Sequence, residues 1–244
     1  MERTLFFSHG NKGGVAKSYT SMVATEFLLG HGQEVALIEA DATQPDIASR
    51  YQNTEGVSLG LLPLNKAGDA ENALADFGAW LESSEPNIVV VNLPAGAGET
   101  LDAIASSIRD LADALEYRLA VTYGLEKNRT AAEGLAKSLS DGLLSVVEPR
   151  DRFVVYPAYK GAAESFEWFH SEAKKSAEIG EIIMPAIGSR SALQKLEATP
   201  GRVADLIDKT NRPQGWMILD QSSVFRWYHA ALSAIDPVFN RGDQ

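Results

Sequence analysis

The chain has 244 residues, a formal net charge of −11 and a hydrophobic fraction of 45%, which suits one α/β domain with a sizeable core. It has no cysteine, so disulfides, thiolate metal sites and cysteine nucleophiles are excluded. The four histidines lack metal-ligand spacing, which argues against a zinc site. A uniformly acidic surface repels DNA and anionic lipid, so binding to either requires a local basic patch or an adaptor protein.

The sequence passes from Met1 directly into a strand pattern, and no apolar run reaches about 18 residues. We therefore expect a cytoplasmic protein with no signal peptide and no membrane span. Internal repeats, low-complexity tracts and linkers are absent from the sequence. This predicts a single domain over residues 1–244.

A glycine-rich stretch follows the first predicted strand, Thr4–Phe7, and precedes a helical pattern over Tyr19–Leu29. It reads Gly10-Asn11-Lys12-Gly13-Gly14-Val15-Ala16-Lys17-Ser18. The order of strand, glycine-rich turn and helix is that of a phosphate-binding loop. Glycines leave backbone N–H groups free to point inward, and the helix directs its positive end to the same place. The loop and Tyr19 are therefore candidates for binding a nucleoside triphosphate, with the Lys17 charge on the phosphates and the Ser18 hydroxyl on Mg²⁺.

The stretch departs from the phosphate-loop pattern at one position, because Ala16 stands where the second glycine is required. If that residue needs a positive φ, alanine costs about 1–2 kcal/mol there.

The next predicted strand, Val35–Asp41, is apolar on both faces and should be central and parallel. Glu39 and Asp41 mark its carboxyl end, which faces the ligand crevice in an open α/β sheet. Asp41 can orient the attacking water or a metal ion there. The alternative is a structural turn, since Asp41 to Pro45 is turn-like.

Strand and helix patterns alternate along the rest of the chain. We expect strands at Val57–Leu62, Asn87–Asn92, Tyr117–Tyr123, Arg152–Tyr156 and Ile182–Pro185, and helices at Asp69–Ser84, Glu99–Leu115, Asn128–Leu139, Arg190–Leu196 and Pro200–Ile207. This alternation predicts a doubly wound, mostly parallel α/β sheet flanked by helices. The tail, about 223–239, is aromatic and has the spacing of an amphipathic helix. It lacks the Lys/Arg-rich polar face of a membrane helix, so core packing or a partner surface is favoured.

The motif from Lys12 to Ser18 resembles the deviant Walker A loop of the ParA/MinD family of ATPases, written K-G-G-x-G-K-S/T. The resemblance implies a SIMIBI-like P-loop NTPase fold that binds ATP and Mg²⁺. It also implies that Lys12 reaches the nucleotide of a partner subunit, so that ATP supports a homodimer. Lys12, Lys17 and Asp41 would be the catalytic residues, and Asp41 would position water near the γ-phosphate.

The chain departs from this family at several positions. Glu39 replaces the first acid of the family's D-x-D strand end, and Asn92 replaces the acid at the switch strand. A neutral amide loses the charge attraction to Mg²⁺, yet Ser18, Asp41 and Asn92 remain the candidate metal ligands. The family's base-reading Asn is also missing.

In its place, Tyr159 is a candidate to stack on the base. Met184 and Pro185 are candidate base contacts by analogy with the family, and ATP and GTP are not distinguished.

The leading functional hypothesis is a slow Mg²⁺-dependent ATPase that dimerises with ATP and acts as a nucleotide switch in plasmid or DNA partition, or in conjugative transfer. An adaptor or partner protein is expected, with direct DNA binding as a secondary prediction and no membrane binding. Two alternatives stay open. One is a nucleotide-sensing scaffold with little hydrolysis, motivated by Ala16 and Asn92, and the other is a P-loop metabolic ligase or synthetase.

Overall fold

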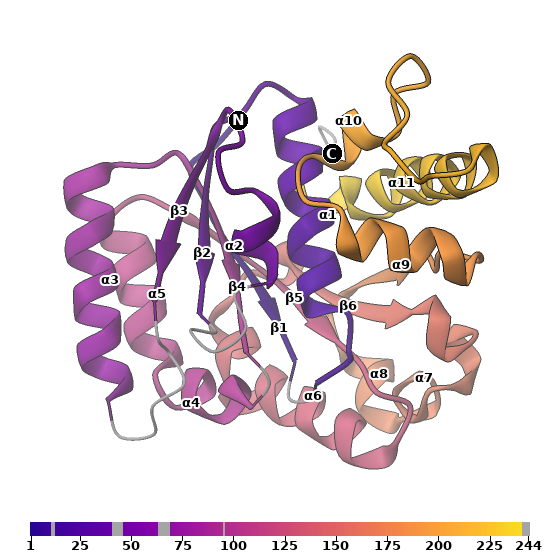
Figure 1. The fold of residues 1–244 in the computed structure, drawn as a ribbon. Coiled ribbons are helices and arrows are strands. Elements are labelled where there is room, and N and C mark those ends of the chain that lie inside the picture. The colour runs from indigo at the N-terminus through magenta and orange to yellow at the C-terminus, as the bar shows by residue number, and fades with distance from the viewer. Residues whose placement is uncertain (11–12, 41–45, 63–68, 95, 241–244) are drawn as a thin grey trace.

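Seven parallel strands form the frame of the molecule (Figure 1). The computed structural model describes residues 1–10, 13–40, 46–62, 69–94 and 96–240. The strands are β1 (Thr4–His9), β2 (Val35–Glu39), β3 (Val57–Leu61), β4 (Ile88–Asn92), β5 (Arg118–Gly124), β6 (Arg152–Pro157) and β7 (Gly180–Met184). Their order across the sheet is β3-β2-β4-β1-β5-β6-β7, and every pairing is parallel. The predicted doubly wound parallel sheet is confirmed.

Helices connect these strands. They are α1 (Lys17–Gly30), α2 (Asp46–Arg50), α3 (Ala70–Ser84), α4 (Ala97–Ala103), α5 (Ala105–Ala114), α6 (Arg129–Asp141), α7 (Glu167–His170), α8 (Glu172–Ser176), α9 (Arg190–Ala198), α10 (Val203–Leu206) and α11 (Ile218–Phe239). Short 3-10 turns lie at η1 (Leu143–Val146), η2 (Pro149–Asp151), η3 (Ala158–Lys160) and η4 (Ala163–Ser165).

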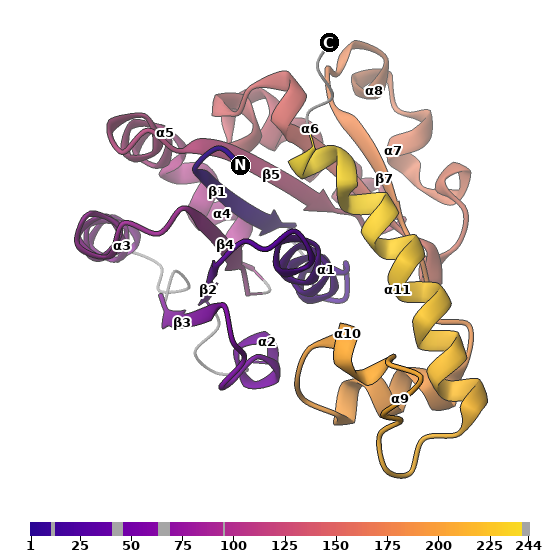
Figure 2. The same ribbon diagram turned by 90° about the horizontal axis from the view of Figure 1, so that it is seen from above.

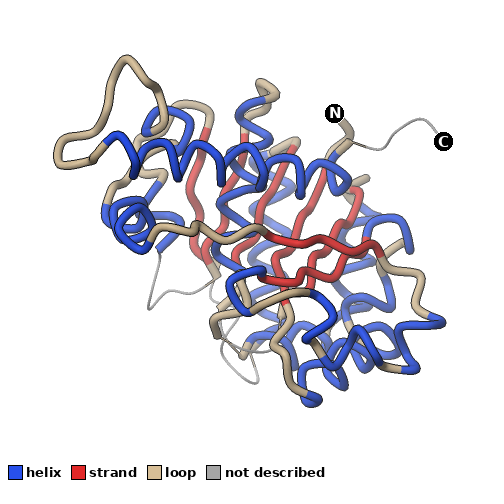
Figure 3. Tube along the Cα trace, turned by 90° about the vertical axis from the view of Figure 1, so that its right-hand side faces the viewer, coloured by secondary structure: helices blue, strands red, loops and turns tan. Residues whose placement is uncertain are grey.

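Two apolar layers cover the two faces of the sheet, because successive side chains of a strand point to opposite sides. In β1, Leu5 and Phe7 pack in one layer, whereas Phe6 packs in the other. The layer on the Leu5 side is filled from α3, α4, α5, α6 and α7, and the layer on the Phe6 side from α1, α2, α9, α10 and α11. Figures 2 and 3 show the helices on both sides of the strands. Burial on both faces explains why the central strands are apolar throughout.

The direction of strand addition reverses at β1, which lies between β4 and β5. In an open α/β sheet, the crevice for a ligand forms outside the carboxyl ends of the strands at such a point. The glycine-rich stretch follows β1 directly. The fold therefore places the candidate phosphate loop at the position where parallel sheets bind ligands.

Some predicted elements differ from the structure. The segment Glu99–Leu115 was expected to be one helix, but it is two, α4 and α5, that meet at Ile104. No glycine or proline marks this break, so the sequence carried no signal for it. The segment Pro200–Ile207 is helical only over α10. By contrast, the predicted Asn128 cap is confirmed, since its Oδ1 accepts a hydrogen bond from the Ala131 N–H at 3.0 Å.

Candidate functional site

Close packing of two backbone segments supports the glycine-rich loop. Gly10 has a φ of +145°, and a Cβ there would lie 2.8 Å from the Gly124 carbonyl oxygen. A Cβ on Gly124 would lie only 2.1 Å from the Val15 carbonyl oxygen. The loop therefore rests directly on the end of β5, and both positions require glycine.

The last residue before α1 has the backbone conformation that its position in the motif predicts. Ala16 has φ 68° and ψ 15°, in the left-handed region, and Gly14 also has a positive φ of 70°. Since left-handed backbone costs a non-glycine residue about 1–2 kcal/mol, the loop carries strain at Ala16. The alanine nevertheless keeps the turn that the glycine-containing motif requires.

Lys17 and Ser18 begin α1 at the mouth of this loop. Lys17 is a buried cation, and its backbone carbonyl accepts a hydrogen bond from the Ser8 hydroxyl at 2.9 Å. Ser18 is partly buried. The first turn of a helix presents free N–H groups and a partial positive charge, so Lys17 adds a full charge where an anion is already favoured.

A chain of buried polar side chains lies beside the start of α1. The Asn92 Nδ2 donates to Glu39 Oε1 at 2.7 Å, and the Ser21 hydroxyl donates to Asn92 Oδ1 at 3.1 Å. Ser21 is three residues after Ser18 and therefore lies on the same side of α1. The site thus combines a phosphate loop with a buried carboxylate and amide at the carboxyl ends of β2 and β4.

Three of the predicted site residues, Asn11, Lys12 and Asp41, lie outside the described residues. The other predicted loop residues, Gly10 and 13–19, lie between the end of β1 and the first turn of α1. Among the described residues there is no group of three or more His, Cys, Asp or Glu side chains that could hold a metal ion.

A small apolar cavity of about 210 Å³ opens beside the loop. It brings the predicted base contacts Met184 and Pro185 together with loop residue Ala16. Its wall consists of Ala16, Tyr19, Tyr159, Met184, Pro185, Ala186, Ile187, Leu193, Glu197 and Trp227. An apolar, aromatic-lined cavity of this kind suits the flat face of a nucleobase.

Hydrogen bonds fix the aromatic side chains of this cavity. The Tyr159 hydroxyl donates to the Gly14 carbonyl of the loop, and Trp227 Nε1 donates to the Pro185 carbonyl at 3.0 Å. The Tyr19 hydroxyl donates to Glu197 Oε1 at 3.1 Å. Burial, with the Glu197 carboxylate as a further cause, raises the pKa of Tyr19, so its hydroxyl stays protonated and remains a donor.

A larger cavity of about 460 Å³ adjoins the same region and is also lined by Tyr19 and Glu197. It lies against α1, α2 and α9, and Ser18, Ser49 and Arg50 contribute polar groups to its wall. The Arg50 guanidinium donates to the carbonyls of Leu196 and Gly201.

The sequence had not singled out Ser21, Glu197 and Trp227. The i, i+3 spacing from Ser18 could have identified Ser21, but Glu197 and Trp227 reach the site only through the packing of α9 and α11.

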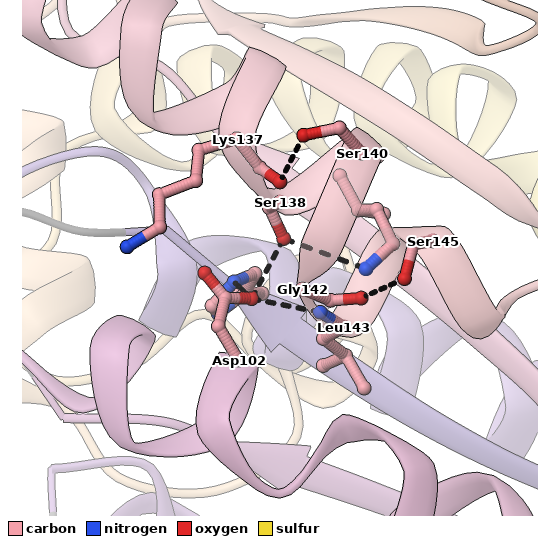
Figure 4. A network of polar contacts seen from close by, with 9 residues as sticks. Asp102, Lys137, Ser138, Ser140, Gly142, Leu143 and Ser145 are labelled. Atoms are coloured by element: carbon pink, nitrogen blue, oxygen red, sulfur yellow. Dashed lines mark hydrogen bonds and ion pairs between the residues drawn. The ribbon is translucent and has the colours of Figure 1, made fainter.

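His9 ends β1 just before the loop and packs inside the protein, as expected for a histidine at a strand end. Its ring lies edge-on to Tyr123, with centroids 4.9 Å apart, and its Nε2 is 3.6 Å from Asp102 Oδ1. Asp102 Oδ1 also accepts hydrogen bonds from the Ser138 hydroxyl and the Leu143 N–H, each at 2.8 Å (Figure 4). Burial alone would raise the pKa of Asp102, but the contacts with His9, Leu143 and Ser138 together hold it below its usual range. This network joins the entry of the loop to α4.

Comparisons with known proteins found one related sequence and several similar folds. No protein-family model matches the chain. It is 25% identical to Protein MobD from Acidithiobacillus ferrooxidans over 177 residues, which are 72% of this chain and 73% of the relative. Among solved structures, it is similar to the signal recognition particle receptor FtsY from Elizabethkingia anophelis, with a TM-score of 0.51 and 14% identity over 93% of this chain and 66% of that one.

A second FtsY structure, from Thermotoga maritima, has a TM-score of 0.49 and 12% identity over 75% of this chain and 62% of that one. The chain therefore spans slightly less than two thirds of the length of the FtsY structures it matches. The parallel sheet and the likeness to the Elizabethkingia structure show that this chain has a doubly wound, parallel α/β fold with helices on both faces. Within the part of the chain that the structure describes, none of the helices is long and apolar enough to cross a membrane.

Proposed function

We propose that this chain binds a nucleoside triphosphate with Mg²⁺ and acts as a slow ATPase switch of the ParA/MinD type. The observation that carries the proposal is the loop between β1 and α1. It combines positive-φ residues at Gly10, Gly14 and Ala16 with a buried lysine at the start of a helix. Backbone N–H groups, helix dipole and lysine charge all favour a polyphosphate at this position.

The described residues fit Mg²⁺ through oxygen donors, which are the ligands this ion prefers. Ser18 would hold the ion with its hydroxyl, and Glu39 is the nearby buried carboxylate. A carboxylate attracts the cation more strongly than the neutral amide of Asn92 does, so Glu39 is the better oxygen donor of the two. When bound, the ion would neutralise negative charge on the phosphates.

Calorimetry with ATP, ADP or GTP and Mg²⁺ tests the binding step. We expect heat of binding for the wild type and at least about a tenfold loss of affinity in Lys17→Ala, because a charge on the phosphates is removed. Lys137→Ala, which removes an exposed lysine from α6, is the matched control and should bind like the wild type. No heat with any of the three nucleotides would contradict the proposal.

Hydrolysis and dimerisation need separate experiments. Steady-state phosphate release that depends on Lys17 would support the ATPase, whereas binding without turnover would favour the nucleotide-sensing scaffold. The proposed homodimer rests on the resemblance at Lys12. Light scattering with ATP should show a dimer in the wild type and a monomer in Lys12→Ala.

From the resemblance to the ParA/MinD family, we also propose a role in plasmid or DNA partition or in conjugative transfer. An adaptor protein would connect the chain to its cargo. Direct DNA binding is a weaker part of this proposal, given the net charge of −11. Filter binding at low salt tests it, and no retention of DNA would remove it.

The 460 Å³ cavity favours a second candidate function, a P-loop ligase or synthetase. Such an enzyme needs an acceptor pocket beside the phosphates, and this cavity is lined by Ser18 and Tyr19 of the loop–helix junction. This reading predicts an assembly state that does not depend on nucleotide. ATP-dependent dimerisation that is lost in Lys12→Ala would argue against it.

A further inference from the structure

The start of α11 carries an exposed apolar stripe, formed by Met217, Ile218, Leu219 and Phe225. Ile218, Leu219 and Phe225 are 70%, 76% and 36% exposed, and Met217 just before the helix is 59% exposed. At 3.6 residues per turn, Ile218, Ser222, Phe225 and His229 lie along one side of the helix, with Leu219 and Arg226 next to them, so apolar side chains alternate with polar ones on this side. Clustered exposed apolar side chains of this kind mark interaction sites.

The opposite side of α11 is already filled by core contacts. Val224, Trp227, Tyr228 and Ala231 are buried, and the helix packs against α1 and α9 (Figure 2). The exposed stripe is therefore a second face of the helix and not its core face. In Figure 1 the loop between α10 and α11 extends away from the rest of the molecule.

Cations accompany the apolar stripe although the chain is acidic overall. Lys209, Arg212 and Arg226 are exposed, and within the described residues no ion pair holds any of them. Lys209 Nζ lies 5.4 Å from the centroid of the Phe225 ring.

The acids nearest in sequence differ in what they contact. The carboxylate of Asp220 is buried and paired with Lys195. Asp208 accepts hydrogen bonds from the N–H and hydroxyl of Thr210, and Asp205 is exposed.

We propose that this surface, the α11 outer face, binds an amphipathic helix of a partner protein whose apolar stripe is flanked by Asp and Glu. The surface comprises Lys209, Arg212, Met217, Ile218, Leu219, Phe225 and Arg226. A helix laid along it would place its apolar side chains between those at positions 218, 222, 225 and 229. Acidic flanks would meet the three cations.

Charge argues against two other occupants of the α11 outer face, a second copy of this chain and an anionic bilayer. In a symmetric pair of copies, each outer face would contact the same face of the other copy, so their cations would be brought together. An anionic bilayer would meet the whole chain, whose charge is −11, whereas a single helix meets only the local cations.

The outer face shares α11 with the candidate nucleotide site. Trp227 follows Phe225 and Arg226 and lines the small cavity together with Ala16 and Tyr19, with its ring 5.9 Å from that of Tyr19. If the proposed function holds, partner binding and nucleotide binding act on opposite sides of one helix.

Fluorescence anisotropy with two synthetic helical peptides, each of about five turns or roughly 18 residues, tests the proposal without nucleotide. Both carry a leucine stripe, flanked by glutamates in one and by lysines in the other. We expect the glutamate peptide to bind at least about tenfold more tightly than the lysine peptide. Leu219→Asp and Phe225→Asp should each weaken it about tenfold, and Arg226→Glu should reduce the difference between the peptides.

Ser140→Asp is the control, since Ser140 is exposed on α6, which packs on the other face of the sheet, and it should leave peptide binding unchanged. Binding of neither peptide, or equal binding of both, would overturn the proposal. The proposal would also be overturned if the wild type sedimented with phosphatidylglycerol vesicles and Leu219→Asp did not. It would equally be overturned if the wild type self-associated and Leu219→Asp did not. Lys17→Ala should lose nucleotide binding and keep peptide binding, whereas Leu219→Asp should lose peptide binding and keep nucleotide binding. Failure of this inference is therefore distinguishable from failure of the proposed function.

Discussion

The side chains of Glu39 and Asn92 face each other across neighbouring strands. They are register partners on β2 and β4, and the amide donates to the carboxylate at 2.7 Å. Both side chains are buried. A carboxylate in such a place needs a donor beside it, because an unpaired buried charge is costly. The amide at position 92, which departs from the family pattern, is therefore matched to the acid at position 39.

Asn92→Asp should destabilise the protein when nucleotide and Mg²⁺ are absent. The change would set two carboxylates against each other in a buried position, so that one must take up a proton or the pair must separate. We expect the free energy of unfolding to fall by about 3 kcal/mol at neutral pH, as measured by urea denaturation.

The double variant Glu39→Gln/Asn92→Asp is the control for this effect. It exchanges acid and amide between the two strands and restores one donor and one acceptor, so most of the lost stability should return. If the double variant is as unstable as Asn92→Asp, like-charge repulsion is not the cause.

Ala16→Gly should relieve the strained start of α1. Glycine removes a left-handed penalty of about 1–2 kcal/mol, offset by about 0.4–1 kcal/mol of added flexibility in the unfolded chain. We expect a net gain of up to about 1 kcal/mol in urea denaturation. Ala75→Gly, at an exposed position inside α3, is the control, and its free energy of unfolding should fall by about 1 kcal/mol. If Ala16→Gly lowers the free energy of unfolding by the same amount, Ala16 is not strained.

Glu26 should make the protein less stable as pH rises. Burial raises its pKa above the ordinary 4.5, and hydrogen bonds from Val203, Tyr51 and Ala204 offset this only in part. Between the ordinary and the raised pKa, the folded state binds more protons than the unfolded state, so the free energy of unfolding falls with increasing pH.

The measurement is urea denaturation of the wild type and Glu26→Gln between about pH 5 and about pH 8. The decline should be absent from the variant. Glu133→Gln, which changes an exposed acid on α6, should keep the wild-type slope. Parallel curves for the wild type and Glu26→Gln would refute the prediction.

Tyr159 should contribute to nucleotide affinity through its ring, if the small cavity holds the base as proposed. Stacking of a base on an aromatic side chain is worth about 1–3 kcal/mol, so Tyr159→Ala should weaken binding by about five- to hundredfold in calorimetry. Tyr159→Phe keeps the ring and loses only the hydrogen bond to Gly14, so it should remain within about threefold of the wild type. Equal losses in both variants would assign the effect to the hydroxyl and not to stacking.

Local sequence signals were enough to predict the sheet and the loop. The apolar strands, the glycines before Lys17 and the Asn128 cap act over a few residues, and their order along the chain implies the parallel topology. The sequence raised a positive φ at Ala16 only as a condition, and the structure shows that the condition is met.

Other features depend on long-range packing and left little trace in the sequence. The break at Ile104 carries no helix-stopping residue. Glu197 and Trp227 reach the small cavity because α9 and α11 fold back onto α1. The tail was predicted as one amphipathic helix, about 223–239, but it begins at Ile218. Its aromatic side chains divide between core and solvent, since Phe225 is exposed whereas Trp227 and Tyr228 are buried.

The hydrogen bonds to the Glu26 carboxylate bear on the order in which parts of the protein can fold during synthesis on the ribosome. It accepts hydrogen bonds from Tyr51, Val203, Ala204 and Tyr228, and three of these four donors lie at least 177 residues after Glu26 in the sequence. In a nascent chain that stops before Val203, only Tyr51 of these four donors is present, so water must supply the remaining hydrogen bonds to this acid. The side of α1 that carries Glu26 is therefore shielded from water only after residues 203–228 have been synthesised.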